Sequence, residues 1–213
     1  MSRRYAQSPR ASLAPLATLA CLLLALHGCT LAPPAASNPD WSALRSRLAT
    51  LDHWQLQGRV NVRYEGESHT PRIRWQQSED DYQIRLWGTF NAGNTLISGT
   101  PKGVKLETDG RTSNARTPER LVLNELGYEL PVSALNYWIK GLPAPRPRSQ
   151  IAFDESNLLA EIRQDGWTVR YLDLRQYGSL TLPRRIELSR DDRDIRLLFI
   201  GLNWTLPEST GSD

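Results

Sequence analysis

The chain has 213 residues, of which 39% are hydrophobic and 23% are charged, with 26 Lys and Arg against 23 Asp and Glu. This size suits one domain with a sizeable core, and no internal repeat divides it. With only two cysteines, a disulfide-stapled scaffold is excluded, and the small net charge of +3 is no strong sign of nucleic-acid binding.

Residues 1–28 are predicted to be a secretory signal peptide. Arg3, Arg4 and Arg10 form a basic head, and the apolar run LATLACLLLAL that follows is too short for a membrane-spanning helix. Cleavage would leave 213 − 28 = 185 residues with 26 − 3 = 23 basic side chains against 23 acidic ones. The formal charge is then zero, so no nucleic-acid partner is expected.

The signal peptide ends in Leu26-His27-Gly28-Cys29, which resembles the bacterial lipobox, although His27 replaces the usual small or β-branched residue. Cleavage before Cys29 and acylation of its thiol and amine are therefore expected. The alternative is an ordinary signal peptide followed by a chance cysteine. Because Cys21 leaves with the signal, the mature domain has no disulfide and depends on its core for stability.

Residues 29–39 are predicted to be an acylated tether rich in Ala and Pro, which could reach on the order of 30 Å when extended. In proteobacterial lipoproteins, which this segment resembles, a residue other than Asp after the acylated cysteine implies sorting to the outer membrane. Thr30 occupies that position. The expected location is the periplasmic side of the outer membrane of a Gram-negative bacterium.

A single domain is predicted over residues 40–206, and it begins with a short amphipathic helix. Asp40 can cap this helix, whose apolar residues recur at helical spacing. These are Trp41, Leu44, Leu48 and Leu51. Residues 207–213 form a polar tail.

Alternation with a period of two begins at Trp54 and predicts a strand with one apolar and one polar face. The turn sequences SEDD, TPKG and TDG favour antiparallel hairpins. Arg72, Arg74 and Arg85 alternate with apolar residues, which is typical of a solvated strand face. Further strands are expected over 72–77, 82–87, 95–99 and 104–108.

Two helices are expected in the middle of the chain. Thr117 as N-cap and Pro118 in the first turn start one helix, which stops at Gly127. The second spans 131–140 and is closed by Gly141. Strands then resume over 151–153, 159–163, 167–174, 179–182, 185–189 and 194–202.

The predicted fold is mainly β with a few helices. About ten or eleven strands would form a single curled antiparallel sheet, an open half-barrel, because the helices are too few to cover a flat sheet of that size. Helices on the concave side would then lid an apolar interior.

Several segments in order together resemble the LolB family of outer-membrane lipoprotein receptors. They are WQLQGRV at 54–60, RWQQ at 74–77, GTFNAG at 88–93, WIKGLP at 138–143 and the closing block from Leu182 to Trp204. The resemblance runs from the lipobox to about Leu206. It implies an open β-barrel with a lidded apolar cavity, shared with the soluble periplasmic carrier LolA.

The resemblance also implies a function. Family members accept the acyl chains of newly made lipoproteins from LolA and release the lipoproteins into the inner leaflet of the outer membrane, without nucleotide or metal. The expected partners are therefore a LolA-type carrier, acylated lipoproteins as cargo and outer-membrane lipid. No cofactor, metal or catalytic residue is expected, and a monomer is predicted.

Two sets of site residues are predicted, the first from the resemblance and the second from the inward faces of the strands and the lid. In the family, the loop matching 88–93 projects an apolar residue, commonly leucine, toward the membrane, so Phe90, Asn91 and Ala92 are predicted to form a membrane-insertion loop. This loop is rich in Gly and Asn and is too long to bury Phe90 well. The residues predicted to line the acyl-chain cavity are Leu56, Val60, Val62, Ile73, Trp75, Ile84, Leu86, Leu106, Trp138, Phe153, Ile186, Leu188, Leu197 and Phe199.

The alternatives are an enzyme, a structural outer-membrane lipoprotein and a carrier of another lipid. An enzyme is disfavoured because His53 and His69 accompany no nucleophile or metal motif, and Asp80-Asp81 and Asp191-Asp192 are typical turn residues. A structural outer-membrane lipoprotein with a filled core, or a carrier of another lipid, would show the same aromatic and aliphatic strand positions.

Overall fold

The computed structural model describes residues 39–88, 94–127 and 129–207. They lie in one compact unit, Asn38–Asp213, and none of the helices among them has the length and hydrophobicity of a membrane span. The elements in chain order are α1 (Pro39–Ala49), β1 (His53–Tyr64), β2 (Glu67–His69), β3 (Arg72–Ser78), β4 (Asp81–Trp87), β5 (Thr95–Thr100), β6 (Gly103–Thr108), β7 (Arg111–Ala115), α2 (Pro118–Leu126), α3 (Val132–Trp138), β8 (Ser149–Phe153), β9 (Leu159–Gln164), β10 (Trp167–Tyr177), β11 (Leu180–Arg190), the 3-10 turn η1 (Asp191–Arg193) and β12 (Ile195–Thr205).

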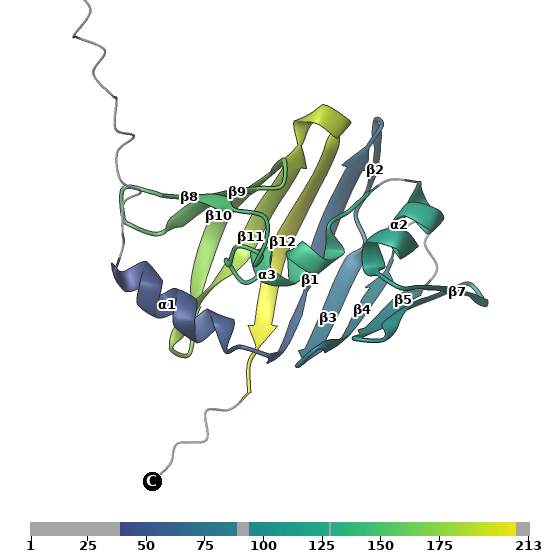
Figure 1. Cartoon of the computed structure of the whole chain (residues 1–213), viewed down its shortest axis with the longest axis horizontal. Helices are drawn as coiled ribbons and strands as arrows, with labels where there is room; N and C mark the ends of the chain where they lie inside the picture. Colours follow the sequence, from purple (N-terminus) through teal and green to yellow (C-terminus); the bar gives the residue numbers. More distant parts are fainter. Residues whose placement is uncertain (1–38, 89–93, 128, 208–213) are drawn as a thin grey trace, which may run out of the picture. The chain divides into compact units, whose positions relative to one another are not determined.

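The strands form one twelve-stranded sheet in the order β7-β6-β5-β4-β3-β1-β12-β11-β10-β9-β8, with β2 paired to β1. Every pairing is antiparallel, and the two halves of the chain join where β1 pairs with β12. The sheet is open, because β7 and β8 stand at opposite ends of this order. Figure 1 shows the helices on one face of the curved sheet. The predicted single curled antiparallel sheet is confirmed.

Three details differ from the prediction. The strands β2 and β7 were not predicted, and the two strands expected over 179–182 and 185–189 are one continuous strand, β11. Pro183 lies inside it, and the pairing with β10 is irregular there, between Asp173 and Leu174. An irregularity of this kind lets a sheet accommodate a residue without an N–H donor. Asp40 lies within α1, which begins at Pro39, rather than capping it.

The caps predicted for α2 are confirmed. The Thr117 hydroxyl accepts a hydrogen bond from the Arg120 amide at 3.3 Å, and Gly127 adopts φ = +80° as its amide donates to the Leu123 carbonyl. Both caps satisfy backbone groups that the helix leaves unpaired. The helix covers a small cluster at one end of the sheet, made of Val104, Leu106 and Leu121.

Tryptophans fill the centre of the larger core between sheet and helices. The Trp54 ring packs against those of Trp75 and Trp204, with centroids 5.4 and 5.1 Å apart, and the Trp138 and Trp167 rings are 6.2 Å apart. All five side chains are buried. Large aromatic groups contribute most of the apolar area that leaves water on folding.

Candidate functional site

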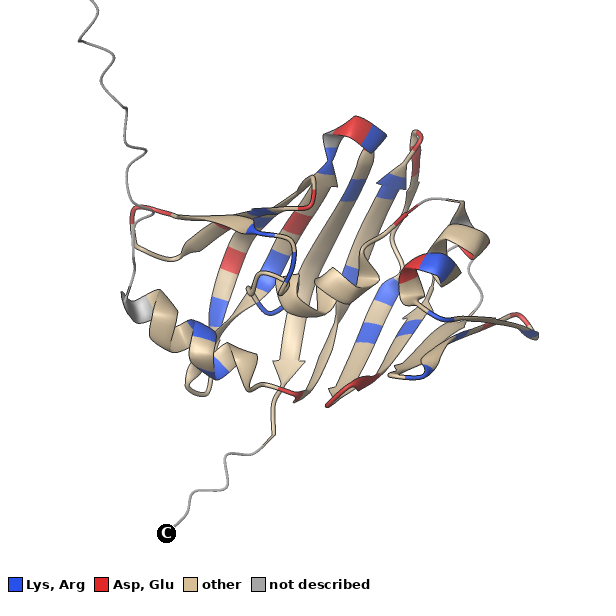
Figure 2. Ribbon diagram, in the orientation of Figure 1, with Lys and Arg blue, Asp and Glu red and all other residues tan. Residues whose placement is uncertain are grey.

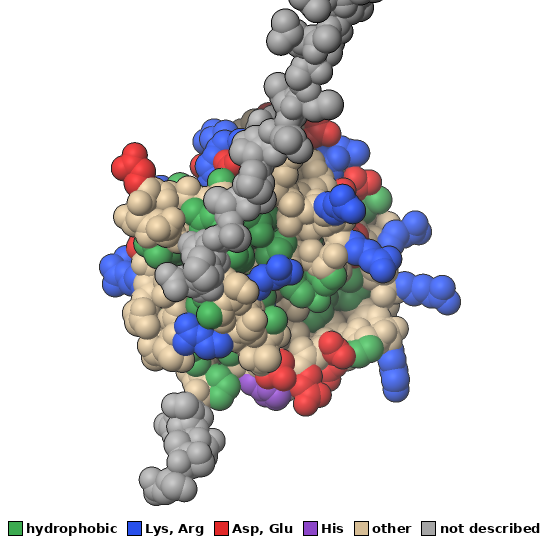
Figure 3. All heavy atoms as spheres, turned by 60° about the vertical axis from the view of Figure 1, so that its left-hand side comes forward, with side chains coloured by type: hydrophobic (Ala, Val, Ile, Leu, Met, Phe, Trp, Pro, Cys, Tyr) green, Lys and Arg blue, Asp and Glu red, His purple; other side chains and the backbone are tan. Residues whose placement is uncertain are grey.

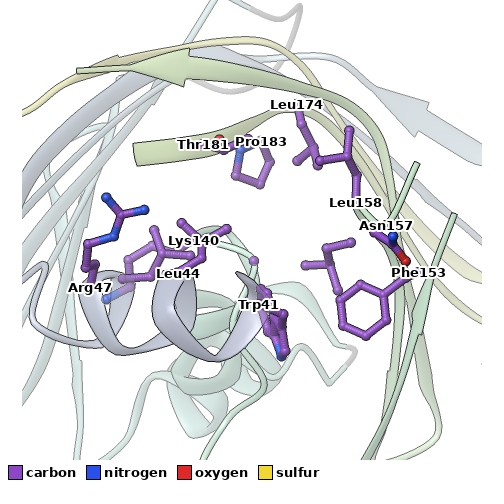
Figure 4. Close-up of a pocket in the computed structure, with 13 residues that line it drawn as sticks. Trp41, Leu44, Arg47, Lys140, Phe153, Asn157, Leu158, Leu174, Thr181 and Pro183 are labelled. Atoms are coloured by element: carbon purple, nitrogen blue, oxygen red, sulfur yellow. The ribbon is translucent and has the colours of Figure 1, made fainter. Parts of the chain in front are cut away.

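A cavity of about 220 Å³ opens between α1 and the strands of the C-terminal half. Figure 4 shows its lining side chains pointing toward a common space from the helix on one side and the strands on the other. We call it the α1 cavity. Its lining is mostly apolar and comprises Trp41, Leu44, Arg47, Leu48, Lys140, Gly141, Phe153, Asn157, Leu158, Leu159, Leu174, Thr181 and Pro183.

Helical spacing places Trp41, Leu44 and Leu48 on the side of α1 that faces the cavity. Leu48 is fully buried, while the Trp41 ring meets the Phe153 ring edge-on at 5.8 Å. At the rim, Leu158 is 46% exposed. In a view from the side of α1 and β8, hydrophobic side chains gather at the middle of the face, with charged ones around it (Figure 3). The α1 cavity therefore presents apolar surface to its opening.

Two cations give this apolar cavity a polar edge. Lys140 is only 7% exposed, and its Nζ donates to the Leu51 carbonyl at 3.0 Å. Burial lowers the pKa of Lys140, and the charge of Asp52 opposes this effect. Arg47 donates from Nη1 to the Ser179 carbonyl at 2.9 Å. The Arg47 bond ties the last turn of α1 to the connection between β10 and β11, and the Lys140 bond holds Leu51 in the segment that follows α1.

A second cavity, of about 250 Å³, lies between α2, α3 and strands β3 to β6. Trp75, Val104, Val132 and Tyr137 contribute apolar surface to it. Two polar groups in its lining, the Tyr82 hydroxyl and the Asn136 Oδ1, are buried without a hydrogen-bond partner among the described residues. The α1 cavity and this second cavity share no lining residue.

Tyr82 lies at the opposite strand position to Gly99, and a Cβ at Gly99 would overlap the Tyr82 ring. Only glycine leaves room for the ring in this position. Burial raises the pKa of Tyr82 to about 12, with a smaller contribution from the charge of Glu119. The neutral phenol is therefore strongly favoured in the folded protein.

The raised pKa of Tyr82 predicts a loss of stability at high pH. In the unfolded chain the phenol ionises near its usual pKa of about 10, so between pH 10 and 12 the folded state binds more protons than the unfolded state. The free energy of unfolding should receive the full contribution of Tyr82 below pH 10 and lose it as the pH rises toward 12. Urea unfolding across this range measures the effect.

Tyr82→Phe is the matched variant for this measurement. It keeps the ring and removes the unpaired hydroxyl, so stability at neutral pH should be equal or higher. Its alkaline decline should be shallower than that of the wild type, although burial also raises the pKa of Tyr171, which remains. An equally steep decline in the variant would show that Tyr82 does not cause it.

The residues predicted to line the acyl-chain cavity occupy the concave side of the sheet or the helix over it. All are at most 6% exposed except Val62, Leu86 and Phe153, which are half-buried. Only Phe153 lines the α1 cavity, and only Trp75 lines the second. The others lie in the core or, like Val62 and Leu86, pack against it, and Leu106 belongs to the cluster under α2. Their contact with an acyl chain stays a prediction.

The predicted anchor and insertion loop lie outside the described residues, which include neither Cys29 nor Phe90, Asn91 and Ala92. The strands that flank the loop are described. Strand β4 ends at Trp87, and Leu86 is paired with Thr95 at the start of β5.

The two pairs of adjacent aspartates lie in or beside tight connections. Asp80 lies in the turn between β3 and β4, and Asp191 and Asp192 lie in η1. His53 is exposed and contacts Asp52 at 2.9 Å. Within the described ranges no three His, Cys, Asp or Glu residues are grouped as metal ligands would be.

Comparisons with known proteins agree with this architecture. The family model for outer membrane lipoprotein LolB matches residues 52–201. Proteins called Outer-membrane lipoprotein LolB are 38% identical in Chromohalobacter salexigens, over 89% of each chain, and 40% identical in Stutzerimonas stutzeri, over 84% of this chain and 90% of the relative.

A similar fold occurs in a crystal structure from Vibrio parahaemolyticus, that of a proposed outer membrane lipoprotein-sorting protein domain. It has a TM-score of 0.51 and 9% identity, and the match covers 82% of this chain and 93% of that one. At this identity it shows the fold alone. The family model and the relatives show that the chain belongs to the LolB family of outer-membrane lipoproteins.

Proposed function

We propose that this protein is the outer-membrane receptor for newly made lipoproteins. It accepts their acyl chains from a soluble periplasmic carrier of the LolA type and inserts them into the inner leaflet of the outer membrane. The observation that carries this proposal is the α1 cavity, an apolar space on the concave side of the sheet that opens between a helix and strands β8 to β11. Membership of the LolB family supports it.

The energetics of acyl chains explain why such a receptor is needed and why it needs no fuel. Each CH₂ group is worth about 0.8 kcal/mol on leaving water, so exposing one sixteen-carbon chain costs on the order of 10 kcal/mol. A cavity that shields part of the chain removes much of this barrier. Because a bilayer shields the whole chain better than the cavity does, transfer into the membrane runs downhill without nucleotide hydrolysis.

The α1 cavity has to enlarge to do this. Its volume of about 220 Å³ is below the roughly 300–1,000 Å³ of pockets that enclose a whole small ligand. The helix α1 is the movable wall, because a few side chains on one of its sides and the hydrogen bond of Arg47 hold it to the domain. Displacement of α1 would enlarge the cavity and add the half-buried side chains around it to the lining.

Leu158→Asp tests whether acyl chains enter through the α1 cavity. A carboxylate at this rim would have to lose water beside the incoming chain, so we expect roughly tenfold weaker binding of a fluorescent acyl probe. Because Leu158 is exposed, the free energy of unfolding should change by no more than about 0.5 kcal/mol. Fluorescence titration and urea unfolding measure the two effects.

Leu123→Asp is the matched control, since Leu123 is also an exposed leucine but lies on α2 and does not line the α1 cavity. It should bind the probe as the wild type does. Equal affinity of both variants and the wild type would place the entrance elsewhere. A wild-type protein without saturable uptake would instead match the alternative of a structural lipoprotein with a filled core.

Depletion of the protein in cells tests the receptor role itself. We expect acylated lipoproteins to accumulate in the periplasm bound to the carrier, because their last acceptor is missing. Pull-down of the carrier and immunoblotting of a bound lipoprotein measure this. Normal delivery of lipoproteins to the outer membrane after depletion would contradict the proposal and favour a carrier of another lipid.

A further inference from the structure

A group of arginines projects from the outer face of the sheet, opposite to the helices. We call it the arginine face, and it consists of Arg59 and Arg63 on β1, Arg72 and Arg74 on β3, Arg85 on β4 and Arg196 on β12. These strands are neighbours in the sheet, and all of these side chains are exposed. Figure 2 shows basic residues as blue bands across this part of the sheet.

The register places arginines directly opposite one another across neighbouring strands. The opposed pairs are Arg59 with Arg72, Arg74 with Arg85, and Arg63 with Arg196. Like charges at opposite positions destabilise a sheet. Within the part of the chain that the structure describes, no carboxylate forms an ion pair with any of these arginines. The arrangement therefore costs stability in the isolated protein.

Elsewhere in the sheet, some basic side chains have acidic partners. Arg170 contacts both Glu161 and Glu187, and Lys105 contacts Glu107 at 2.8 Å. Among the described strand pairings, arginines lie directly opposite one another only on the arginine face. A dense, unneutralised set of guanidinium groups matches a surface that carries many anionic oxygens. The planar fork of arginine binds phosphate with two parallel hydrogen bonds.

We propose that the arginine face binds the anionic phospholipid headgroups of the membrane leaflet to which the protein is anchored. The register supports a lipid surface as the occupant. Arg72 lies opposite Trp87, the last residue of β4, and Arg85 lies opposite Leu96 of β5. The arginine face therefore borders the connection between β4 and β5, which carries the predicted membrane-insertion loop. Exposed Ile200, opposite Arg59, adds apolar surface beside the charges.

The proposal deepens the proposed function and rests on it for its purpose. Headgroups bound to this face would orient the domain on the leaflet, with the β4–β5 connection against the lipid, before cargo is released. Binding to the leaflet itself needs no cargo and can be measured separately.

Flotation with vesicles tests the proposal. The protein is the chain from residue 29 with Cys29→Ala, which contains the whole compact unit Asn38–Asp213 but has no acyl anchor. Vesicles contain either phosphatidylcholine alone or phosphatidylethanolamine with phosphatidylglycerol, at low and high salt. We expect binding to the anionic vesicles only, and weaker binding at high salt.

The test variant carries Arg72→Gln, Arg74→Gln and Arg85→Gln. Each arginine near an anionic surface is worth about a fivefold change in affinity, so the variant should bind roughly a hundredfold more weakly. Because like-charge pairs are removed, its stability should be unchanged or higher. The control loses the same charge from exposed arginines away from this face. It carries Arg111→Gln, Arg120→Gln and Arg148→Gln.

Three results would overturn the proposal. In the first, the two triple variants bind anionic vesicles equally well. In the second, the wild type binds both kinds of vesicle equally well. In the third, the wild type binds no vesicles, and the test variant has lower affinity than the wild type for the LolA-type periplasmic carrier. The last result would assign the face to an acidic protein. Uptake of the acyl probe by the wild type, measured in parallel, reports on the proposed function whatever the vesicles show.

Discussion

Phe90→Glu is expected to slow the release of lipoproteins into membranes by about one to two orders of magnitude while leaving folding and acyl uptake near the wild-type level. Burying a phenylalanine side chain in an apolar environment is worth about 1.5–3 kcal/mol, and each 1.4 kcal/mol is tenfold. If insertion of this side chain opens the bilayer for the cargo, the variant loses that free energy. The carboxylate adds a desolvation cost of its own.

The measurement is transfer of an acylated lipoprotein from the receptor to vesicles, followed by flotation. Phe90→Leu should release cargo normally, because it keeps an apolar side chain. Asn94→Glu places the same charge on an exposed residue at the base of the loop and should have a much smaller effect. A Phe90→Glu protein that folds and releases cargo at the wild-type rate would show that the membrane-contacting residue lies elsewhere.

The long strands could be predicted from the sequence because one of their faces is buried. In β3, for example, Ile73 and Trp75 alternate with exposed Arg72 and Arg74, and this pattern has the period of a strand. Strand β7, with the sequence RTSNA, has no such alternation because none of its side chains is buried. Its backbone pairing with β6 leaves no trace in the residue types.

The cavities could not be predicted in the same way. Alternation identifies which side chains face inward, but the position of α1 decides which of them are packed and which line a space. Leu174 and Pro183 line the α1 cavity because α1 contacts β11, and β11 pairs with β10 at these two residues. Leu158 comes from the connection between β8 and β9, where no period exists. These contacts join residues far apart in the sequence.

The arginine face could likewise be predicted from the sequence only in part. The exposure of Arg72, Arg74 and Arg85 is what alternation predicts. Their opposition across strands depends on the register, which the turn lengths and the buried face fix together. Only the paired positions show that like charges lie opposite one another.

A buried glutamine holds the helix α3, which lines the second cavity, to the sheet. Gln164 is 3% exposed, and its Oε1 accepts hydrogen bonds from Trp138 Nε1 at 2.8 Å and from the Ala144 amide at 2.9 Å. Its Nε2 donates to the carbonyls of Ala144 and Pro147. One side chain on β9 thus forms hydrogen bonds both with α3 and with the connection that follows it. No sequence pattern distinguishes Gln164 from an exposed glutamine.

Gln164→Leu is expected to lower the free energy of unfolding by about 3–5 kcal/mol. Each buried polar group that loses its partner costs about 1–3 kcal/mol, and the substitution leaves the indole N–H of Trp138 and the backbone groups of Ala144 and Pro147 without one. Because those groups hold α3 and the following connection to the sheet, hydrogen exchange at α3 amides should accelerate more than at the centre of β1. Urea unfolding and native-state exchange measure the two effects.

Gln83→Leu is the matched control, because Gln83 is an exposed glutamine on the outer face of β4. This substitution should change the free energy of unfolding by no more than about 0.5 kcal/mol. A loss below about 1 kcal/mol for Gln164→Leu would mean that core packing alone holds α3 in place.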